Sequence, residues 1–137
     1  MGLSIHDNLL ISYEVQCESR TILLRTECRT KNQPTKFINV VFNGVQGYRF
    51  ENDAFGNIVL DLEPVAIDQF ITEYGAGIEA SYKMAGSPGP WAKNLEAASL
   101  HLHAQKIQAF ILSSSFGLSG WILAREMTVF SADPPIR

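Results

Sequence analysis

The sequence has few cysteines and no long apolar run, and both absences narrow the class of protein. Its 137 residues include two cysteines, Cys17 and Cys28, whereas small secreted domains held by disulfides carry more. The strand pattern described below places these two at opposite ends of a hairpin, too far apart to bridge. No stretch approaches the roughly 18 apolar residues that cross a bilayer, and residues 1–10 lack the features of a secretory signal. We therefore expect a cytoplasmic protein with reduced thiols and no membrane partner.

Positive charge is also scarce. Eleven Lys and Arg stand against fourteen Asp and Glu, which gives a formal net charge of -3. A nucleic-acid-binding protein normally needs a clustered basic face, so we expect no nucleic-acid partner. Apolar residues make up 46 % and charged residues 18 % of the chain, as is typical of a folded domain. The length fits a single domain, 1–137, with an ordered core over about residues 5–130.

The motifs of common catalytic and metal sites are missing as well. The sequence contains no phosphate-binding loop, dinucleotide-binding glycine motif or zinc-protease motif. Ser119 fails the nucleophile-elbow pattern because Trp121 stands where the second glycine is required. His101 and His103 fall on a predicted helix, where residues two apart point about 200° from each other. The pattern predicts no catalytic residue, no metal and no cofactor, and it favours a protein that is not an enzyme.

Alternation of apolar and polar residues predicts strands on both sides of a helical middle. The predicted strands cover Leu9–Val15, Ile22–Cys28, Phe37–Phe42, Tyr48–Phe50, Ile58–Glu63, Ile107–Ser114 and one long strand over Leu118–Phe130. Strands joined by short turns pair antiparallel, and helices inserted as one block indicate the α+β class. We expect a curved antiparallel sheet or half-open barrel of about seven strands, with a two-helix block inserted before the C-terminal hairpin.

Apolar spacings of three and four from Ile67 to Tyr82 predict the first helix of that block. Pro64 suits its first turn, where the missing N–H costs nothing. Gly75 and Gly77 weaken its middle, so a bend or break is expected there. The second helix is predicted to run from about Asn94, a good N-cap residue, to about Gln105.

His6 and Asp7 form a pair directly ahead of the first predicted strand. A histidine beside a carboxylate can act as a general base, which leaves a hydrolase as the third functional hypothesis. The alternative is that the pair caps the strand by hydrogen bonding to backbone groups, as Asp often does.

Acidic residues gather in the turn predicted over residues 51–57 and in the strand that follows it. Glu51 and Asp53 lie in the turn, and Asp61 and Glu63 share one face of the strand because they are two residues apart. They predict an acidic surface for a basic partner. The alternative is the ordinary solvated face of an amphipathic strand, whose charge discourages aggregation between sheets.

Several aromatic residues fall near loops or strand ends, where large rigid rings can contribute to binding. Tyr48, Phe55 and Trp91 are the predicted apolar anchors beside the acidic surface, and Trp91 is expected to be partly exposed in a Gly- and Pro-rich loop. A different reading places Tyr13, Tyr48, Trp91 and Trp121 around a small-ligand pocket between the sheet and the helices.

Four short motifs occur together in a recognisable order. They are His6-Asp7, then Phe42-Asn43-Gly44-Val45 leading to Tyr48-Arg49-Phe50, then Gly56-Asn57-Ile58 before Asp61, and finally Ser113–Trp121. This order resembles small proteins similar to the immunity proteins of bacterial polymorphic-toxin systems, over about residues 6–125. The resemblance implies a protein that blocks a toxin or another partner by stoichiometric binding, and it carries over no catalytic residue.

We therefore expect a non-catalytic protein-binding module that resembles an immunity or antidote protein and meets a protein partner of basic character. The small-ligand-binding domain is the main alternative. Homodimerisation through an exposed sheet edge also fits the pattern.

Overall fold

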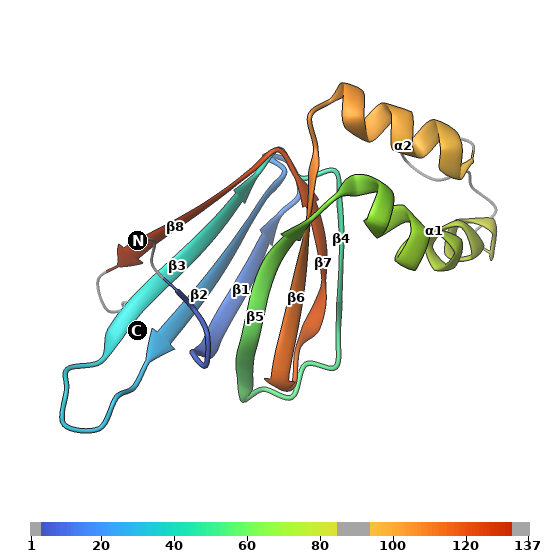
Figure 1. The fold of residues 1–137 in the computed structure, drawn as a ribbon. Helices are drawn as coiled ribbons and strands as arrows, with labels where there is room; N and C mark the ends of the chain where they lie inside the picture. The colour runs from blue at the N-terminus through green and yellow to red at the C-terminus, as the bar shows by residue number, and fades with distance from the viewer. Residues whose placement is uncertain (1–3, 85–93, 133–137) are drawn as a thin grey trace.

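Eight strands and two helices make up the part of the chain that the computed structural model describes, residues 4–84 and 94–132 (Figure 1). The strands are β1 (Leu9–Gln16), β2 (Thr21–Cys28), β3 (Lys36–Asn43), β4 (Gly47–Glu51), β5 (Asn57–Val65), β6 (Gln108–Phe116), β7 (Ser119–Ala124) and β8 (Glu126–Ala132). The helices are α1 (Ile67–Met84) and α2 (Leu95–Ala104). Trp91, one of the predicted anchors, lies outside the described residues.

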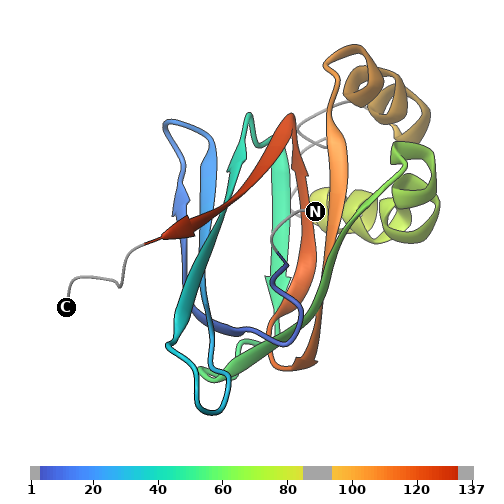
Figure 2. The same cartoon turned by 60° about the vertical axis from the view of Figure 1, so that its left-hand side comes forward.

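All eight strands belong to one antiparallel sheet with the order β4-β7-β6-β5-β1-β2-β3-β8. The sheet bends between β5 and β1, where only Leu9 and Leu10 pair with Ile58 and Asn57. Because of this bend, the strands β4, β7, β6 and β5 (the helix-bearing half) face the strands β1, β2, β3 and β8 (the bare half), as Figures 1 and 2 show. The sheet is not closed, since β4 and β8 are its two edges.

Two sharp corners carry the chain from one half to the other. After β3 the chain turns at Gly44, and after β7 it turns at Arg125. The amide of Arg125 donates to the carbonyl of Asn43 at 3.0 Å, so the corners lie against each other. Gly44 has a φ of +65°, and a Cβ there would approach the Arg125 side chain to 2.9 Å. The first corner therefore requires glycine.

The space between the two halves is filled by apolar side chains. Phe42 on β3 meets Phe110 on β6 edge to face, with ring centroids 5.3 Å apart, although these strands are not neighbours in the sheet. The shared cluster is formed by Ile5, Leu10, Ile22, Leu24, Ile38, Val40, Phe42, Val45, Val59, Phe110, Leu112, Leu118, Ile122 and Ala124. The alternation predicted from the sequence thus turns one face of each half inward.

A second apolar cluster holds the helices on the opposite, outer face of the helix-bearing half. Phe70 of α1 is fully buried there and packs edge to face on Trp121 of β7, with ring centroids 5.1 Å apart. Leu102 of α2 belongs to the same cluster. Both helices cover the upper part of this face in Figure 1, so its lower part carries no helix. Neither helix has, over its described residues, a segment long and apolar enough to cross a bilayer.

The predicted α+β class and the helical block before the β6–β7 hairpin are confirmed, and so is the N-cap at Asn94, whose side chain accepts from the amide of Ala97 at 2.8 Å. Both cysteines are free, with Cys17 after β1 and Cys28 at the end of β2. The expected break at Gly75 and Gly77 does not occur; α1 is one continuous helix that includes both glycines.

Two predictions about element boundaries were wrong. Leu118–Phe130 is not one strand, because the corner at Arg125 divides it into β7 and β8, which lie on opposite halves. The sheet therefore has eight strands rather than seven. Pro64 does not start α1 but pairs with Phe110 near the end of β5. Proline is tolerated there because it is close to the end of the ladder, and the helix begins at Ile67 instead.

A polar clamp joins α1 to α2. The carboxylate of Asp68 accepts from the hydroxyl of Ser99 at 2.9 Å and lies 3.1 Å from Nε2 of His103. The hydrogen bond from His103, and then that from Ser99, hold the pKa of Asp68 below its usual value of 3.8.

This clamp gives a pH-dependent prediction. A carboxyl whose pKa is lowered in the folded state stabilises the protein above pH 3.8, and this contribution is lost as the pH falls through the lowered value. We expect Asp68→Asn to lower the urea midpoint near neutral pH and to match the wild type once Asp68 is protonated. Glu18→Gln, in the exposed β1–β2 turn, is the control. An Asp68→Asn deficit that stays the same below pH 3.8 would contradict the prediction.

Candidate functional site

The register of the helix-bearing half places the acidic residues of β4 and β5 on the same outer face. Two rows of side chains cross this face below the helices. The tryptophan row contains Arg49, Trp121, Ile111 and Glu63, which are paired in turn from β4 to β5. The serine row contains Glu51, Ser119, Ser113 and Asp61. Glu51 pairs with Ser119, and Asp61 pairs with Ser113. Ser119 and Ser113 lie opposite each other, one residue beyond the last β6–β7 pair, Leu112 and Gly120. Adjacent strands are about 4.8 Å apart, so each row spans roughly 14 Å.

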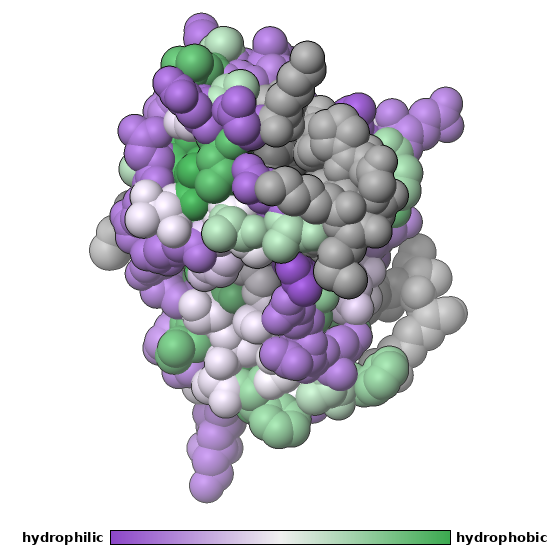
Figure 3. Space-filling model, turned by 90° about the vertical axis from the view of Figure 1, so that its right-hand side faces the viewer, coloured by the Kyte–Doolittle hydropathy of each residue, from purple (hydrophilic) through white to green (hydrophobic). Residues whose placement is uncertain are grey.

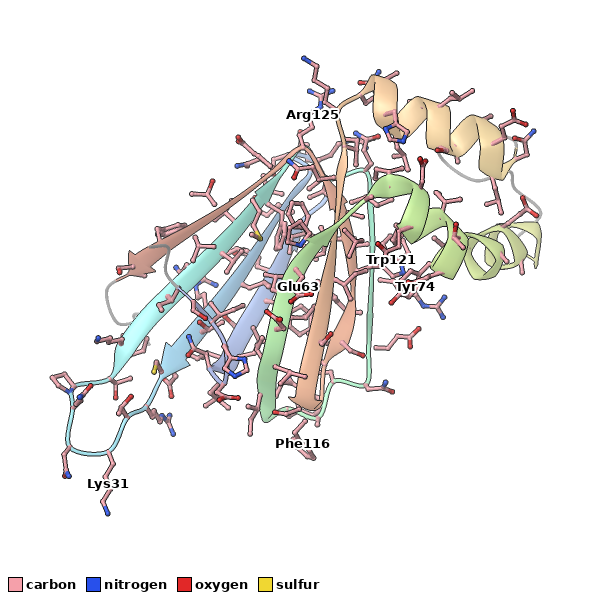
Figure 4. All side chains as sticks on the ribbon, viewed as in Figure 1. Lys31, Glu63, Tyr74, Phe116, Trp121 and Arg125 are labelled. Carbon is pink, nitrogen blue, oxygen red and sulfur yellow. The ribbon has the colours of Figure 1, made fainter. Side chains whose placement is uncertain are left out.

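A groove lies between α1 and these rows. Its volume is about 420 Å³, which falls in the range of small-ligand sites. Trp121 on β7 and Tyr74 on α1, both labelled in Figure 4, belong to its lining. The groove is lined by Arg49, Glu51, Glu73, Tyr74, Gly77, Ile78, Ile111, Leu112, Ser113, Ser114, Ser119, Gly120 and Trp121.

Charge is distributed unevenly along the two rows. At the β4 end, Nε of Arg49 lies 2.6 Å from Oε1 of Glu51, so these two charges balance. At the β5 end, Asp61 and Glu63 lie two residues apart on the same face, and the neighbouring Asp61 carboxyl, through hydrogen bonding and repulsion, raises the pKa of Glu63 above its ordinary value of 4.5. No Lys or Arg among the described residues forms an ion pair with either carboxyl. The β5 end is therefore the negative end of the face.

The turn between β4 and β5 is built around Asp53. Its carboxylate accepts hydrogen bonds from the Asn57 side chain, the Phe55 amide and the Tyr13 hydroxyl, each at 2.9 Å. These bonds, led by the one from Asn57, lower the pKa of Asp53, and the bond to Asp53 raises the pKa of Tyr13. Phe55 has a φ of +60° and is 96 % exposed. The predicted Asp53 thus holds the turn together, and the turn presents Phe55 to solvent.

The aromatic residues predicted for a ligand pocket do not share one face. Tyr48 and Phe50 lie on the side of β4 opposite to Arg49 and Glu51. Phe50 packs on Tyr48 and on Tyr13, with centroids 5.3 Å apart in each pair. Trp121 lies on the outer face with the helices. Tyr48 is 43 % exposed, but it lies on the opposite side of β4 from the acidic rows.

His6 and Asp7 lie on the surface beside β5. The ring of His6 bonds through Nδ1 to the carbonyl of Leu60, and its Nε2 lies 3.3 Å from Asp7. The Asp7 amide donates to the carbonyl of Val59 at 2.8 Å. Both residues are more than half exposed, and their contacts fasten the N-terminal segment to β5. Over the described residues no group of three potential metal ligands occurs, and His103 contacts Asp68 instead.

Several residues of this face were not predicted from the sequence. Apolar side chains are exposed at its lower end, where Figure 4 labels Phe116 at the tip of β6 and Figure 3 shows green side chains along the lower margin. Phe116 is 58 %, Leu60 43 % and Ile58 38 % exposed. Strict alternation places Ile58 and Leu60 on the side opposite to Asp61 and Glu63, so the sequence did not mark them for this face; the register shifts on both sides of Val59 interrupt that alternation. No sequence signal marked Glu73 and Tyr74 either, because their role depends on where α1 lies.

The serine-rich motif near the C-terminus has a structural role. The side chain of Asn57 accepts from the amides of Ala54 at 2.9 Å and Leu118 at 2.8 Å, and it joins the start of β5 to the β6–β7 turn. Gly117, with a φ of +92°, sits against Asn57, where a Cβ would lie 2.0 Å from the amide oxygen. Asn57, Gly117 and Leu118 of these motifs therefore shape the fold around the site.

Comparison of the chain with protein-family models, with curated proteins and with solved structures found no match. The fold and the geometry of the outer face are therefore the basis for any functional conclusion.

Proposed function

We propose that this protein is a non-catalytic protein-binding module, and that the outer face of its helix-bearing half receives a basic protein partner. The observation that carries the proposal is the pair Asp61 and Glu63, which share the outer face of β5 and form no ion pair with a Lys or Arg of the described residues. Two like charges held together raise the free energy of the unbound protein. A cationic partner removes that repulsion and is steered towards it.

Exposed apolar residues beside the carboxyls support a macromolecular partner. Phe55, Ile58, Leu60 and Phe116 come from the β4–β5 turn, β5 and β6, which meet at the lower end of the sheet. Aromatic side chains next to charged groups are a common composition of protein interfaces. A partner covering this region and the two rows would bury an area typical of stable complexes, roughly 1,200–2,000 Å².

The resemblance to immunity proteins supplies the class of partner. Under the proposal, the partner is a toxin-like protein whose basic active surface is blocked by stoichiometric binding. Inhibition of this kind needs a preformed face and no reactive group. Asp61 and Glu63 lie on β5, which is paired with β6 inside the eight-stranded sheet, so their positions are set before the partner arrives.

Charge reversal tests the proposal. The protein is used to capture partners from its native extract, and a partner found at equal stoichiometry is then titrated against variants by calorimetry. We expect Asp61→Lys/Glu63→Lys to bind roughly 100-fold more weakly, because it turns attraction into repulsion at the centre of the contact.

The matched control is Glu18→Lys/Glu126→Lys. It changes the net charge by the same amount, but its residues belong to the bare half. We expect it to retain the wild-type affinity. Equal loss in both double variants, or none in the first, would overturn the proposed face, provided that circular dichroism shows both variants folded.

The groove favours a second candidate, a small-ligand-binding domain, because 420 Å³ is enough for a small molecule. Its walls differ from the pocket predicted from the sequence, since Tyr13 and Tyr48 are absent from them. Mass spectrometry of the natively purified protein distinguishes the two candidates. A bound small molecule that raises the melting temperature, with no protein at equal stoichiometry, would favour the second.

A further inference from the structure

The groove under α1 has the chemistry of a site for one particular side chain. Its occupant must fit between two carboxylates from different elements, because Glu51 reaches it from β4 and Glu73 from α1. Arg49 is the one cation among its described lining residues and is held by Glu51 at 2.6 Å. Glu73 contacts only a neutral amide, that of Gln69 at 3.3 Å. The α1 wall thus has a carboxylate that is not neutralised by any described cation.

The floor of the groove offers hydrogen-bond acceptors. The hydroxyls of Ser113 and Ser119 lie in the middle of the serine row and make no hydrogen bond with another described residue. Hydroxyl and carboxylate oxygens together suit an occupant rich in N–H donors. Figure 3 shows this part of the outer face as a pale band, as expected for Ser, Gly, Tyr and Trp side chains of intermediate hydropathy.

Aromatic rings form the inner end of the groove. Tyr74 stacks on Phe70 with centroids 5.3 Å apart, and Phe70 in turn fixes Trp121. Trp121 is only 6 % exposed and forms the buried base of this wall, whereas Tyr74 is partly exposed and is the ring that the groove can offer to an occupant. A planar guanidinium can lie on such rings and present its N–H groups to surrounding oxygens, which an ammonium group does less well.

We propose that this groove receives an arginine side chain of the partner, with the guanidinium between Glu73 and the serine floor and its plane against Tyr74. The inference rests on the proposed function and adds the residue type that the partner must present. Asp61 and Glu63 then attract the partner at the β5 end of the same rows, while the groove provides selectivity for arginine.

A blocked arginine peptide tests this site directly. In an NMR titration with acetyl-Gly-Arg-Gly-amide, we expect roughly millimolar binding and shift changes at the Trp121 indole and the amides of Ser113 and Ser119. The isosteric citrulline peptide, which is neutral, should bind about tenfold more weakly. Glu73→Gln should weaken the arginine peptide by a similar factor, whereas the control Glu18→Gln should leave it unchanged.

Equal binding of the arginine and citrulline peptides, or shift changes away from the groove, would overturn this inference. Its failure is distinguishable from failure of the proposed function. Loss of partner binding in Asp61→Lys/Glu63→Lys, combined with no arginine-peptide binding, leaves the protein-binding face standing and removes only the groove. Peptide binding in the groove without any effect of the charge reversal removes the acidic face as the place where the partner docks.

Discussion

Replacing Gly120 by alanine is expected to detach the edge strand β4 from the sheet. A Cβ at this position would lie 1.8 Å from the carbonyl oxygen of Arg49 and 2.8 Å from its carbonyl carbon. These are backbone atoms, which cannot swing aside as a side-chain end can. Since β4 pairs only with β7, the strand must move as a unit and lose its register over Gly47–Glu51. We expect a loss of about 3 kcal/mol in the free energy of unfolding, measured by urea denaturation.

Gly77→Ala is the matched control for this prediction. A Cβ at Gly77 meets nothing within 4 Å, and the residue lies inside α1. Alanine should therefore stabilise the protein by about 1 kcal/mol through its higher helix propensity. Two glycine replacements of the same size are thus expected to have opposite signs. A Gly120→Ala variant as stable as the wild type would show that β4 does not approach β7 as closely as described.

Replacing Phe70 by alanine is expected to separate the helices from the sheet. Phe70 is fully buried, and it contacts both Trp121 on β7 and Tyr74 on its own helix. Its removal leaves a cavity at the centre of the helix–sheet cluster, and such truncations cost about 4 kcal/mol. The cluster between the two halves contains neither helix. We therefore expect loss of the near-ultraviolet signal of Trp121 at lower urea concentration than loss of the strand signal.

Leu100→Ala serves as the control, because Leu100 is on α2 but 67 % exposed. Its replacement should change stability by less than about 0.5 kcal/mol. Coincident loss of both spectroscopic signals in Phe70→Ala would show that the helices and the sheet unfold as one cooperative unit, contrary to this expectation.

Local patterns predicted most of the elements but not the way in which they connect. Alternation identified β1 to β6 because each strand has one face in the inner cluster, and the stripe from Ile67 identified α1 because its buried residues follow helical spacing. The division of Leu118–Phe130 had a weak local sign, because the apolar run from Trp121 to Ala124 is followed by two consecutive charged residues, Arg125 and Glu126. That the chain turns a corner there depends on a distant residue, Asn43, whose carbonyl accepts from the amide of Arg125 more than eighty positions later in the chain.

The candidate site was predictable to a similar extent. Spacing alone places Asp61 and Glu63 on one face, and Glu51 was expected to join them from a turn. Glu51 is instead the last residue of β4, and it shares their face because β7 lies between β4 and β6. Asp53 was expected at the acidic surface, yet its three hydrogen bonds make it a turn residue. Tyr48 was expected beside the carboxyls, and the alternation of β4 turns it to the other side of the sheet.

The order of strands has a consequence for synthesis of the chain. β4 follows β3 directly, yet its only partner in the sheet is β7, and the partner of β3 at the opposite edge is β8. A ribosome that has released β4 has therefore not yet made the segment with which it pairs. The β1–β2–β3 meander can form early, while β4 remains unpaired until β7 has emerged. Chaperones can bind an unpaired strand of this kind during translation. A chain truncated before β7 would leave both β4 and the outer edge of β3 without their partner strands.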